Sequence, residues 1–264
     1  MKTLFPFLFS LWYVYGTIVI NVPNEKDTFL SFDKSLEVSV PITVCIRFKL
    51  EGYSTNRIIF RSKNNNFGLA LGTKYDIGWI RWDKVAVPFK IIRNLLQPYI
   101  WYHLCFALDK KSYAVIVDGQ QWYESSFENK ISEKTTFNQI RLGSAGEDTI
   151  YEDFKGELTE LNIWDKAMSK EEMIELTKTC EIANPAPDIL NWSKDIALYL
   201  SGGEDTSTIA MTHLCPKGDH TVEKHRIVQV LLNQDDAIHT CNILNGKVAY
   251  PITIDDIKTW KSRF

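Results

Sequence analysis

The sequence has little excess charge of either sign and no block of lysine or arginine residues. Its 264 residues include 30 basic and 33 acidic residues, which gives a formal charge of -3 at pH 7. Binding to nucleic acid or to an anionic membrane surface needs a concentrated basic patch. We therefore expect no nucleic-acid partner. The hydrophobic content of 45% is sufficient for a buried core and excludes a chain that is disordered by composition.

Long apolar runs are also scarce, and the one strong run stands at the N-terminus. Met1-Lys2-Thr3 is followed by residues 4–15, which are almost wholly apolar, and then by Gly16 and Thr17. This pattern is typical of a cleaved secretory signal peptide, here residues 1–16. The alternative is a membrane anchor, but the run is shorter than the roughly 20 residues that span a bilayer. We expect a secreted, extracellular mature protein without a membrane span.

Cysteine is infrequent, and none of the five cysteines has a Cys-x-x-Cys or zinc-ligand spacing. This absence disfavours metal or redox chemistry. All five follow the signal peptide and therefore enter an oxidising compartment, where disulfides form. Their odd number leaves one cysteine over. The five are Cys45, Cys105, Cys180, Cys215 and Cys241.

Short runs of β-forming residues, separated by turn residues, extend from residue 17 to about residue 143. This spacing predicts an all-β fold, a two-sheet antiparallel sandwich. Asp118-Gly119 stands between two such runs and predicts a tight hairpin, because both positions tolerate positive φ. The runs are residues 29–32, 42–48, 57–60, 67–71, 77–82, 101–108, 113–117 and 140–142, with one more strand at 158–164.

One short helix is predicted after the last of these strands. Ser169 and Glu172 form a capping-box pattern, which predicts a helix at about residues 170–178. After a proline-rich break, residues 189–200 are predicted to be a last extended segment. The composition becomes polar beyond Gly202-Gly203, so the sandwich is predicted to span residues 17–203.

Several of these stretches occur in an order that resembles the pentraxin family, within the wider laminin-G-like jelly rolls. The resemblance covers roughly residues 18–203 and implies a jelly-roll sandwich. The chain departs from the family signature after His103-Leu104-Cys105, where Phe106-Ala107-Leu108-Asp109 replaces a hydroxyl residue followed by tryptophan. The matching stretches are 43–48 (TVCIRF), 103–105 (HLC), 117–119 (VDG), 156–165 (GELTELNIWD) and 189–192 (ILNW).

The resemblance implies a disulfide between Cys45 and Cys105, which lie in apolar runs predicted to be neighbouring strands. Closing such a long loop stabilises a secreted domain by about 2–5 kcal/mol. A second bridge, between Cys180 and Cys215, would tie the C-terminal segment to the sandwich and leave Cys241 single. The other two pairings of these three cysteines remain open.

The resemblance also implies calcium on one face of the sandwich. The matching positions are Asn65 and Asn66, before an early strand, and Glu147 and Asp148, after a Leu-Gly strand end. Calcium takes six to eight oxygen ligands, several of them anionic. The asparagines are neutral and the acidic loop is short, so we expect weak binding carried mainly by Glu147 and Asp148. The alternative is a solvated acidic turn beside an Asn-rich hairpin tip.

The motifs of common enzymes are missing. There is no nucleophile elbow or phosphate-binding loop. Glu157 and Glu160 are three apart, so a regular strand would place them on opposite faces, unlike the paired carboxylates of a glycosidase. His103 stands beside Cys105, but that cysteine is assigned to the disulfide, so a structural histidine is expected. We do not expect an enzyme.

Residues 204–264 are predicted to be a small, partly helical C-terminal extension. Residues 235–244 have apolar residues at helical spacing, ending at Asn245-Gly246. One run resembles the opening helix of a C-type lectin domain, and the alternative is a packed extension. That run is Ala237, Cys241, Leu244, Gly246, Ala249 and Pro251.

The leading functional hypothesis is a secreted recognition module that binds surface glycans or phospholipid head groups, with calcium assisting. The resemblance supplies this ligand class, and it is consistent with a homo-oligomer. The alternative is a laminin-G-like adhesive or structural domain of a receptor ectodomain that contacts another protein. Asn191 begins the one Asn-x-Ser/Thr sequon. It lies in a segment expected to pack on the sandwich, so low glycan occupancy is expected.

Overall fold

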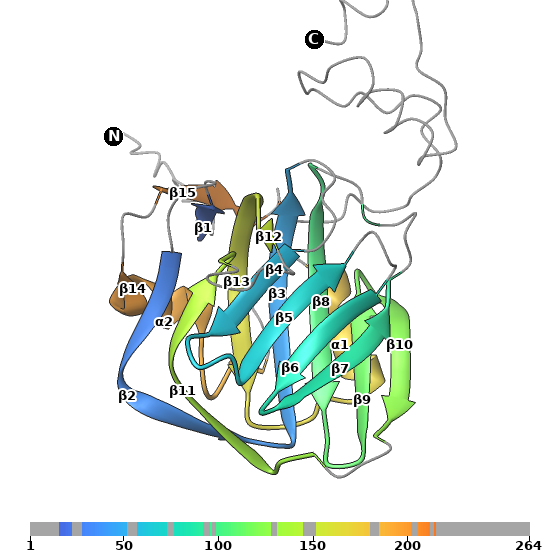
Figure 1. Cartoon of the computed structure of the whole chain (residues 1–264). Coiled ribbons are helices and arrows are strands. Elements are labelled where there is room, and N and C mark those ends of the chain that lie inside the picture. Colours follow the sequence, from blue (N-terminus) through green and yellow to red (C-terminus); the bar gives the residue numbers. More distant parts are fainter. Residues whose placement is uncertain are drawn as a thin grey trace, which may run out of the picture. The chain divides into compact units, whose positions relative to one another are not determined.

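In a computed structural model, the described residues form two β-sheets packed face to face and two helices (Figure 1). The strand pairs are antiparallel except for one short parallel pair, β12 with β4. The structure describes residues 16–22, 28–51, 57–72, 77–91, 96, 99–127, 131–144, 152–179, 185–201, 205–211 and 214.

Sheet A has seven strands. Their order is β10 (Gln120–Ser126), β9 (Ser112–Val117), β8 (Trp101–Leu108), β3 (Ile42–Leu50), β13 (Gly156–Trp164), β1 (Gly16–Val22) and β15 (Asp205–Ala210). The predicted Asp118-Gly119 hairpin joins β9 to β10, with φ values of 47° and 73° at its two central residues. These are the positive angles that a two-residue hairpin of this kind requires.

Sheet B has eight strands, seven of them in one continuous path. Their order is β14 (Leu200–Ser201), β2 (Thr28–Ser39), β11 (Lys134–Leu142), β4 (Arg57–Ser62), β5 (Phe67–Gly72), β6 (Ile77–Trp82) and β7 (Val85–Lys90). The eighth strand, β12 (Glu152–Asp153), pairs with the start of β4.

The core lies between the sheets because alternate residues of each strand point inward. In β6, for example, Gly78, Ile80 and Trp82 are buried while the two residues between them are half-buried. Aromatic rings from sheet B occupy part of the centre, where Phe67 stacks on Phe137 with ring centroids 5.2 Å apart. We call the face of each sheet that points away from the other sheet its outer face.

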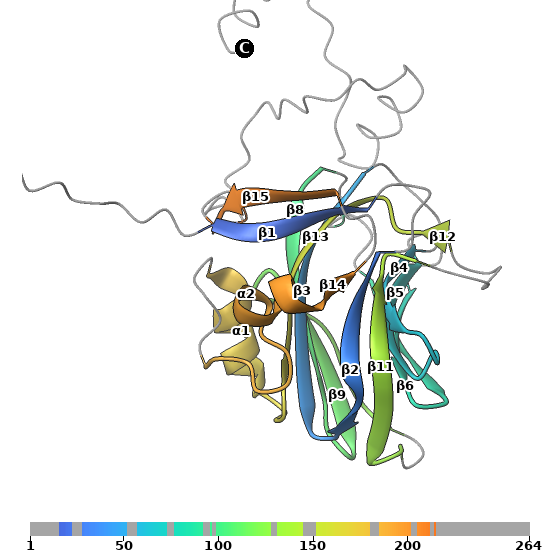
Figure 2. The ribbon, with the colours of Figure 1, turned by 90° about the vertical axis from the view of Figure 1, so that its left-hand side faces the viewer.

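Both helices lie on the sheet A side of the molecule (Figure 2). Helix α1 (Lys170–Lys178) begins with the predicted capping box and buries Met173 and Leu176 beside the Cys45–Cys105 pair. Helix α2 (Trp192–Tyr199) places Trp192 and Ile196 in the main core. Among the described residues, neither helix has the length and apolar character needed to cross a membrane.

The predicted all-β jelly-roll sandwich is confirmed, but residues 189–200 are not one extended segment. Trp192 and Ile196 are spaced four apart, which places both on the buried side of a helix. The helix start is also stabilised locally, because Asp195 accepts a hydrogen bond from the backbone N–H of Asn191. Within the predicted sandwich, residues 17–203, the described residues thus form two helices where the sequence predicted one.

The sandwich also continues past residue 203, where the sequence predicted its end. Strand β15 pairs with β1 over six residue pairs and forms the edge of sheet A. Its sequence, DTSTIA, is polar apart from the last two residues, so composition alone gave no sign of a strand. Residues 1–15 of the predicted signal peptide and residues 215–264 of the predicted extension lie outside the described residues.

Candidate functional site

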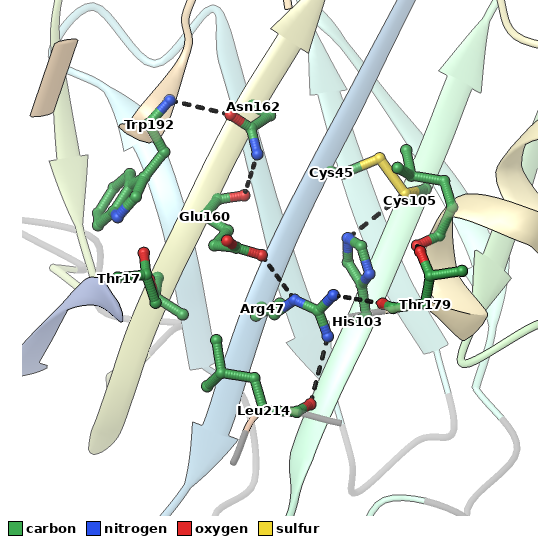
Figure 3. Close-up of polar contacts among 12 residues, drawn as sticks. Thr17, Cys45, Arg47, His103, Cys105, Glu160, Asn162, Thr179, Trp192 and Leu214 are labelled. Carbon is green, nitrogen blue, oxygen red and sulfur yellow. Dashed lines mark hydrogen bonds and ion pairs between the residues drawn. A yellow bond between two sulfur atoms is a disulfide. The ribbon is translucent and has the colours of Figure 1, made fainter. Parts of the chain in front are cut away.

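A buried polar cluster lies on the outer face of sheet A (Figure 3). Arg47 of β3 stands opposite His103 of β8 and is 1% exposed. Its Nε donates to Oε2 of Glu160 at 2.7 Å, and its two terminal nitrogens donate to backbone carbonyls. These carbonyls belong to Thr179, at 2.8 Å, and to Leu214, at 3.3 Å. One guanidinium therefore joins β3, β13 and the segments that follow α1 and β15.

The charges in this cluster are balanced. Burial raises the pKa of Glu160, and the positive charge of Arg47 opposes that rise. Burial, and secondly the charge of Arg47, holds the pKa of His103 well below its usual value. His103 is therefore neutral at pH 7, and Arg47 and Glu160 form one ion pair. Because the cluster is buried and linked to four segments of the chain, its arrangement fits a structural role.

The prediction that Glu157 and Glu160 face opposite sides of β13 is wrong. The β13–β3 register shifts within residues 159–162, and Glu160 has a φ of 53°, so a β-bulge interrupts the alternation. Glu157 pairs with Lys49 and Glu160 pairs with Arg47. These basic residues lie two apart on β3 and share its outer face. Both carboxylates therefore lie on that face, each beside its own basic partner.

The structure contains the predicted disulfide between Cys45 and Cys105, which stand directly opposite each other on β3 and β8. Nε2 of His103 lies 4.0 Å from Sγ of Cys105. The two sulfur atoms and this histidine lie within 4.8 Å of one another, a spacing that could suit a metal. Cysteine binds metal as a thiolate, which the disulfide removes. Three further cysteines, Cys180, Cys215 and Cys241, lie outside the described residues.

The outer face of sheet B carries a row of arginines contributed by three strands. Arg141 of β11 pairs with Arg61 of β4, which pairs with Gly68 of β5, which pairs with Arg81 of β6. Each arginine stands between two buried residues of its own strand, so its side chain points outward. All three are half-buried. We call Arg141, Arg61 and Arg81 the arginine row.

An apolar row lies next to the arginine row. Ile58, Ala70, Trp79 and Pro88 pair in sequence across β4, β5, β6 and β7. The indole of Trp79 extends over Gly72, because a Cβ at that glycine would collide with Cζ3 of the ring. Trp79 packs against Ile58 and Ala70 and is itself half-buried. The outer face of sheet B therefore combines an aromatic ring with three guanidinium groups.

The predicted calcium ligands Asn65 and Asn66 form the turn between β4 and β5. Asn65 has a φ of 57° and donates its N–H to the Ser62 carbonyl, and the Asn66 N–H donates to the Ser62 hydroxyl. The Asn65 carbonyl accepts from Nε of Arg81 at 3.0 Å. A positive charge thus lies within hydrogen-bond distance of the turn, which opposes a cation there.

The other predicted ligands, Glu147 and Asp148, lie outside the described residues. Before them in the chain, Gly143 donates its backbone N–H to the Ile59 carbonyl of β4. After them, Glu152 pairs with Arg57 at the start of the same strand. The asparagine turn follows the opposite end of β4. Of the four predicted ligands, the structure describes Asn65 and Asn66.

The sequon residue Asn191 is the N-cap of α2 and is 7% exposed. Its Oδ1 accepts a hydrogen bond from the hydroxyl of Ser193 at 2.8 Å. The side chain that would carry a glycan is thus buried and engaged. This position fits the low occupancy that the sequence predicts.

Sequence reasoning missed both the Arg47 cluster and the arginine row. Arg47 gave a signal, since it is a charged residue within the apolar run TVCIRFKL of β3. A buried charge in such a run needs a partner. The arginine row gave none, because its members are up to 80 residues apart in sequence and meet only through strand register.

Comparison with known proteins agrees with this architecture. A family model described as the concanavalin A-like lectin/glucanases superfamily matches residues 24–173. The match covers more than half of the chain, which belongs to this superfamily and has a laminin-G-like jelly roll. No curated protein matches the sequence.

Similar solved structures include a heptameric SAP-like pentraxin from Limulus polyphemus. It is 18% identical, with a TM-score of 0.59, and the match covers 77% of this chain and 98% of the pentraxin. The full extracellular region of zebrafish Gpr126/Adgrg6 is 16% identical, with a TM-score of 0.54, covering 73% of this chain and 26% of that one. A putative carbohydrate binding protein from Bacteroides ovatus is 16% identical, with a TM-score of 0.52, covering 73% of this chain and 60% of that one. These similarities establish the shared jelly-roll fold, and the chain spans only part of the last two proteins.

Proposed function

We propose that this protein is a secreted recognition module that binds glycans on the outer face of sheet B. The observation that carries the proposal is the position of Trp79, half-buried on that face and extended over Gly72. Aromatic rings offer an apolar surface together with a polar edge, which suits the apolar faces and hydroxyl groups of sugars. The neighbouring arginines supply hydrogen-bond donors.

The two outer faces differ in what covers them. Helix α1 and the segments bound by Arg47 cover much of sheet A. Both described helices lie on that side, away from β4, β5 and β6 (Figure 2). Among the described residues, no helix lies over the outer face of sheet B. The superfamily match, and the similarity to a putative carbohydrate binding protein from Bacteroides ovatus, support a glycan as the ligand.

Calcium assistance, which the pentraxin resemblance implies, would depend on Glu147 and Asp148. The asparagine turn is a poor contributor because Arg81 already donates to the Asn65 carbonyl. Carboxylates are the better ligands for calcium, since they are anionic. Titration of the mature protein with calcium, repeated after changing both acidic residues to their amides, tests this part of the proposal. Heat of binding that persists in the amide variant would contradict it.

A glycan array probed with the mature protein, with and without a chelator, tests the main proposal. Trp79→Ala should lose most of the signal, because it removes the ring surface. Leu198→Ala is the matched control, since Leu198 is a 77% exposed apolar residue on α2. Equal binding by wild type and Trp79→Ala would contradict the proposed face. Absence of glycan binding, together with binding to another protein, would favour the adhesive-domain alternative.

A further inference from the structure

We infer that the ligand is an acidic glycan chain, with carboxylate or sulfate groups repeated along its length, that lies across the strands of sheet B. This inference rests on the proposed function and adds a ligand class to it. It is carried by the arginine row, in which strand register aligns Arg141, Arg61 and Arg81 in a line across the strands of sheet B.

The spacing of the row favours a chain over a single acidic group. Neighbouring strands lie about 4.8 Å apart, so Arg141 and Arg61 are one strand step apart and Arg61 and Arg81 are two. The row therefore covers three steps, or about 14 Å. One carboxylate cannot contact three guanidinium groups over that length. A chain with repeated acidic groups can contact them in succession.

The chemistry of arginine favours oxygen anions. A guanidinium has five N–H donors in a planar fork, and its two terminal nitrogens suit contact with carboxylate or sulfate oxygens. The Nε atoms of Arg61 and Arg141 are buried, so the terminal nitrogens are the atoms that would contact the chain. In Arg81, the Nε donor is used by the Asn65 carbonyl, and this bond orients the group on the outer face. Gly68 adds no side chain between Arg61 and Arg81, so the row is not interrupted at β5.

The charges near the row are mostly of one sign. Lys90 of β7 adds a fourth basic residue on the same face. It pairs with Ile77, which precedes Arg81 by four residues on β6. Among the described residues that pair with the arginine row, with the apolar row or with Ile77, the acidic one is Asp153, which pairs with Ile58. The excess of positive charge attracts an anionic chain and makes its binding sensitive to salt.

Binding of a heparin octasaccharide, a hyaluronan octasaccharide and a neutral chito-oligosaccharide to the mature protein tests the inference. We expect at least one acidic probe to bind more tightly than the neutral probe, and its affinity to fall as salt rises. Preference for heparin or for hyaluronan distinguishes sulfate from carboxylate recognition. Arg61→Gln should weaken acidic binding about tenfold or more, because hydrogen bonds to charged groups are strong. Lys194→Gln, the same charge change on α2, should have little effect.

A second variant keeps the test independent of arginine packing. Ala86 pairs with Arg81 at the end of the row and is exposed, so Ala86→Glu adds a negative charge without removing an internal contact. This variant should weaken acidic binding, while Ala86→Gln should not.

Three outcomes would overturn the inference. Tighter binding of the neutral probe would do so while leaving the proposed glycan function intact. Equal binding of polyglutamate would show that the row recognises any polyanion rather than a glycan. Binding of none of the three glycans would contradict the inference and the proposed function together.

Discussion

Removing Arg47 should destabilise the fold more than any surface charge change. The guanidinium is 1% exposed and donates to Glu160, Thr179 and Leu214. In Arg47→Met, Glu160 keeps a largely buried charge without its partner, and the two carbonyls lose a donor. Breaking a buried ion pair from one side costs about 3–5 kcal/mol. That is a large part of the 5–15 kcal/mol by which a typical domain is stable.

Urea denaturation of four proteins measures this cost: wild type, Arg47→Met, Glu160→Leu and the double variant. The double variant should be more stable than Arg47→Met, because it no longer buries an unpaired carboxylate. Lys134→Met is the control, since the Lys134–Glu37 pair is exposed and its loss should barely move the midpoint. A cost below about 1 kcal/mol for Arg47→Met, or a double variant less stable than the single one, would refute this reasoning.

The same variant has a predicted pH dependence. Burial raises the folded-state pKa of Glu160, and Arg47 opposes that rise. Without Arg47 the folded state binds this proton more tightly than the unfolded state does. Stability linked to Glu160 is then present at low pH and is lost as pH rises through the folded pKa. The destabilisation of Arg47→Met should therefore shrink between pH 7 and pH 5. A cost that grows with acid would contradict the assignment.

Three further predictions follow from described residues. The depressed pKa of His103 means that the unfolded state takes up its proton first, so stability should fall as pH drops below about 6.5. Thermal melts of His103→Leu should lose less stability than wild type between pH 7.5 and pH 5, and an equal loss would count against a buried neutral histidine. Arg47 binds the carbonyls of the residues immediately before Cys180 and Cys215, so non-reducing peptide mapping should find these two cysteines joined; a Cys215–Cys241 peptide would disprove this. Treatment with a glycosidase specific for N-linked glycans should leave the mass of the secreted protein unchanged at Asn191, and a mass loss there would contradict the buried position.

Most of the strands and α1 were predictable because their signals are local. Alternating apolar residues, the Asp118-Gly119 turn and the capping box at Ser169 each act within a few residues. Helix α2 was not predicted although Trp192 and Ile196 have helical spacing, because the apolar residues of this segment also suit an extended strand. Strand β15 was missed because it is an edge strand with a polar sequence.

The site was much less predictable than the fold. The absence of a basic block in the sequence is real, yet strand register aligns Arg141, Arg61 and Arg81 on one face. The bulge at Glu160 similarly reverses an inference from regular alternation. In both cases the decisive quantity is the register between strands distant in sequence, which no local pattern records.

The indole N–H resonance of Trp79 gives the most direct test of glycan recognition on the outer face of sheet B. Heteronuclear NMR of the mature protein, with this signal assigned through Trp79→Phe, would follow titration with the glycan that binds best. We predict that the Trp79 indole signal shifts with saturating glycan, while the signals of the fully buried Trp82, Trp164 and Trp192 stay in place. An unmoved Trp79 signal in a saturated complex would contradict the account.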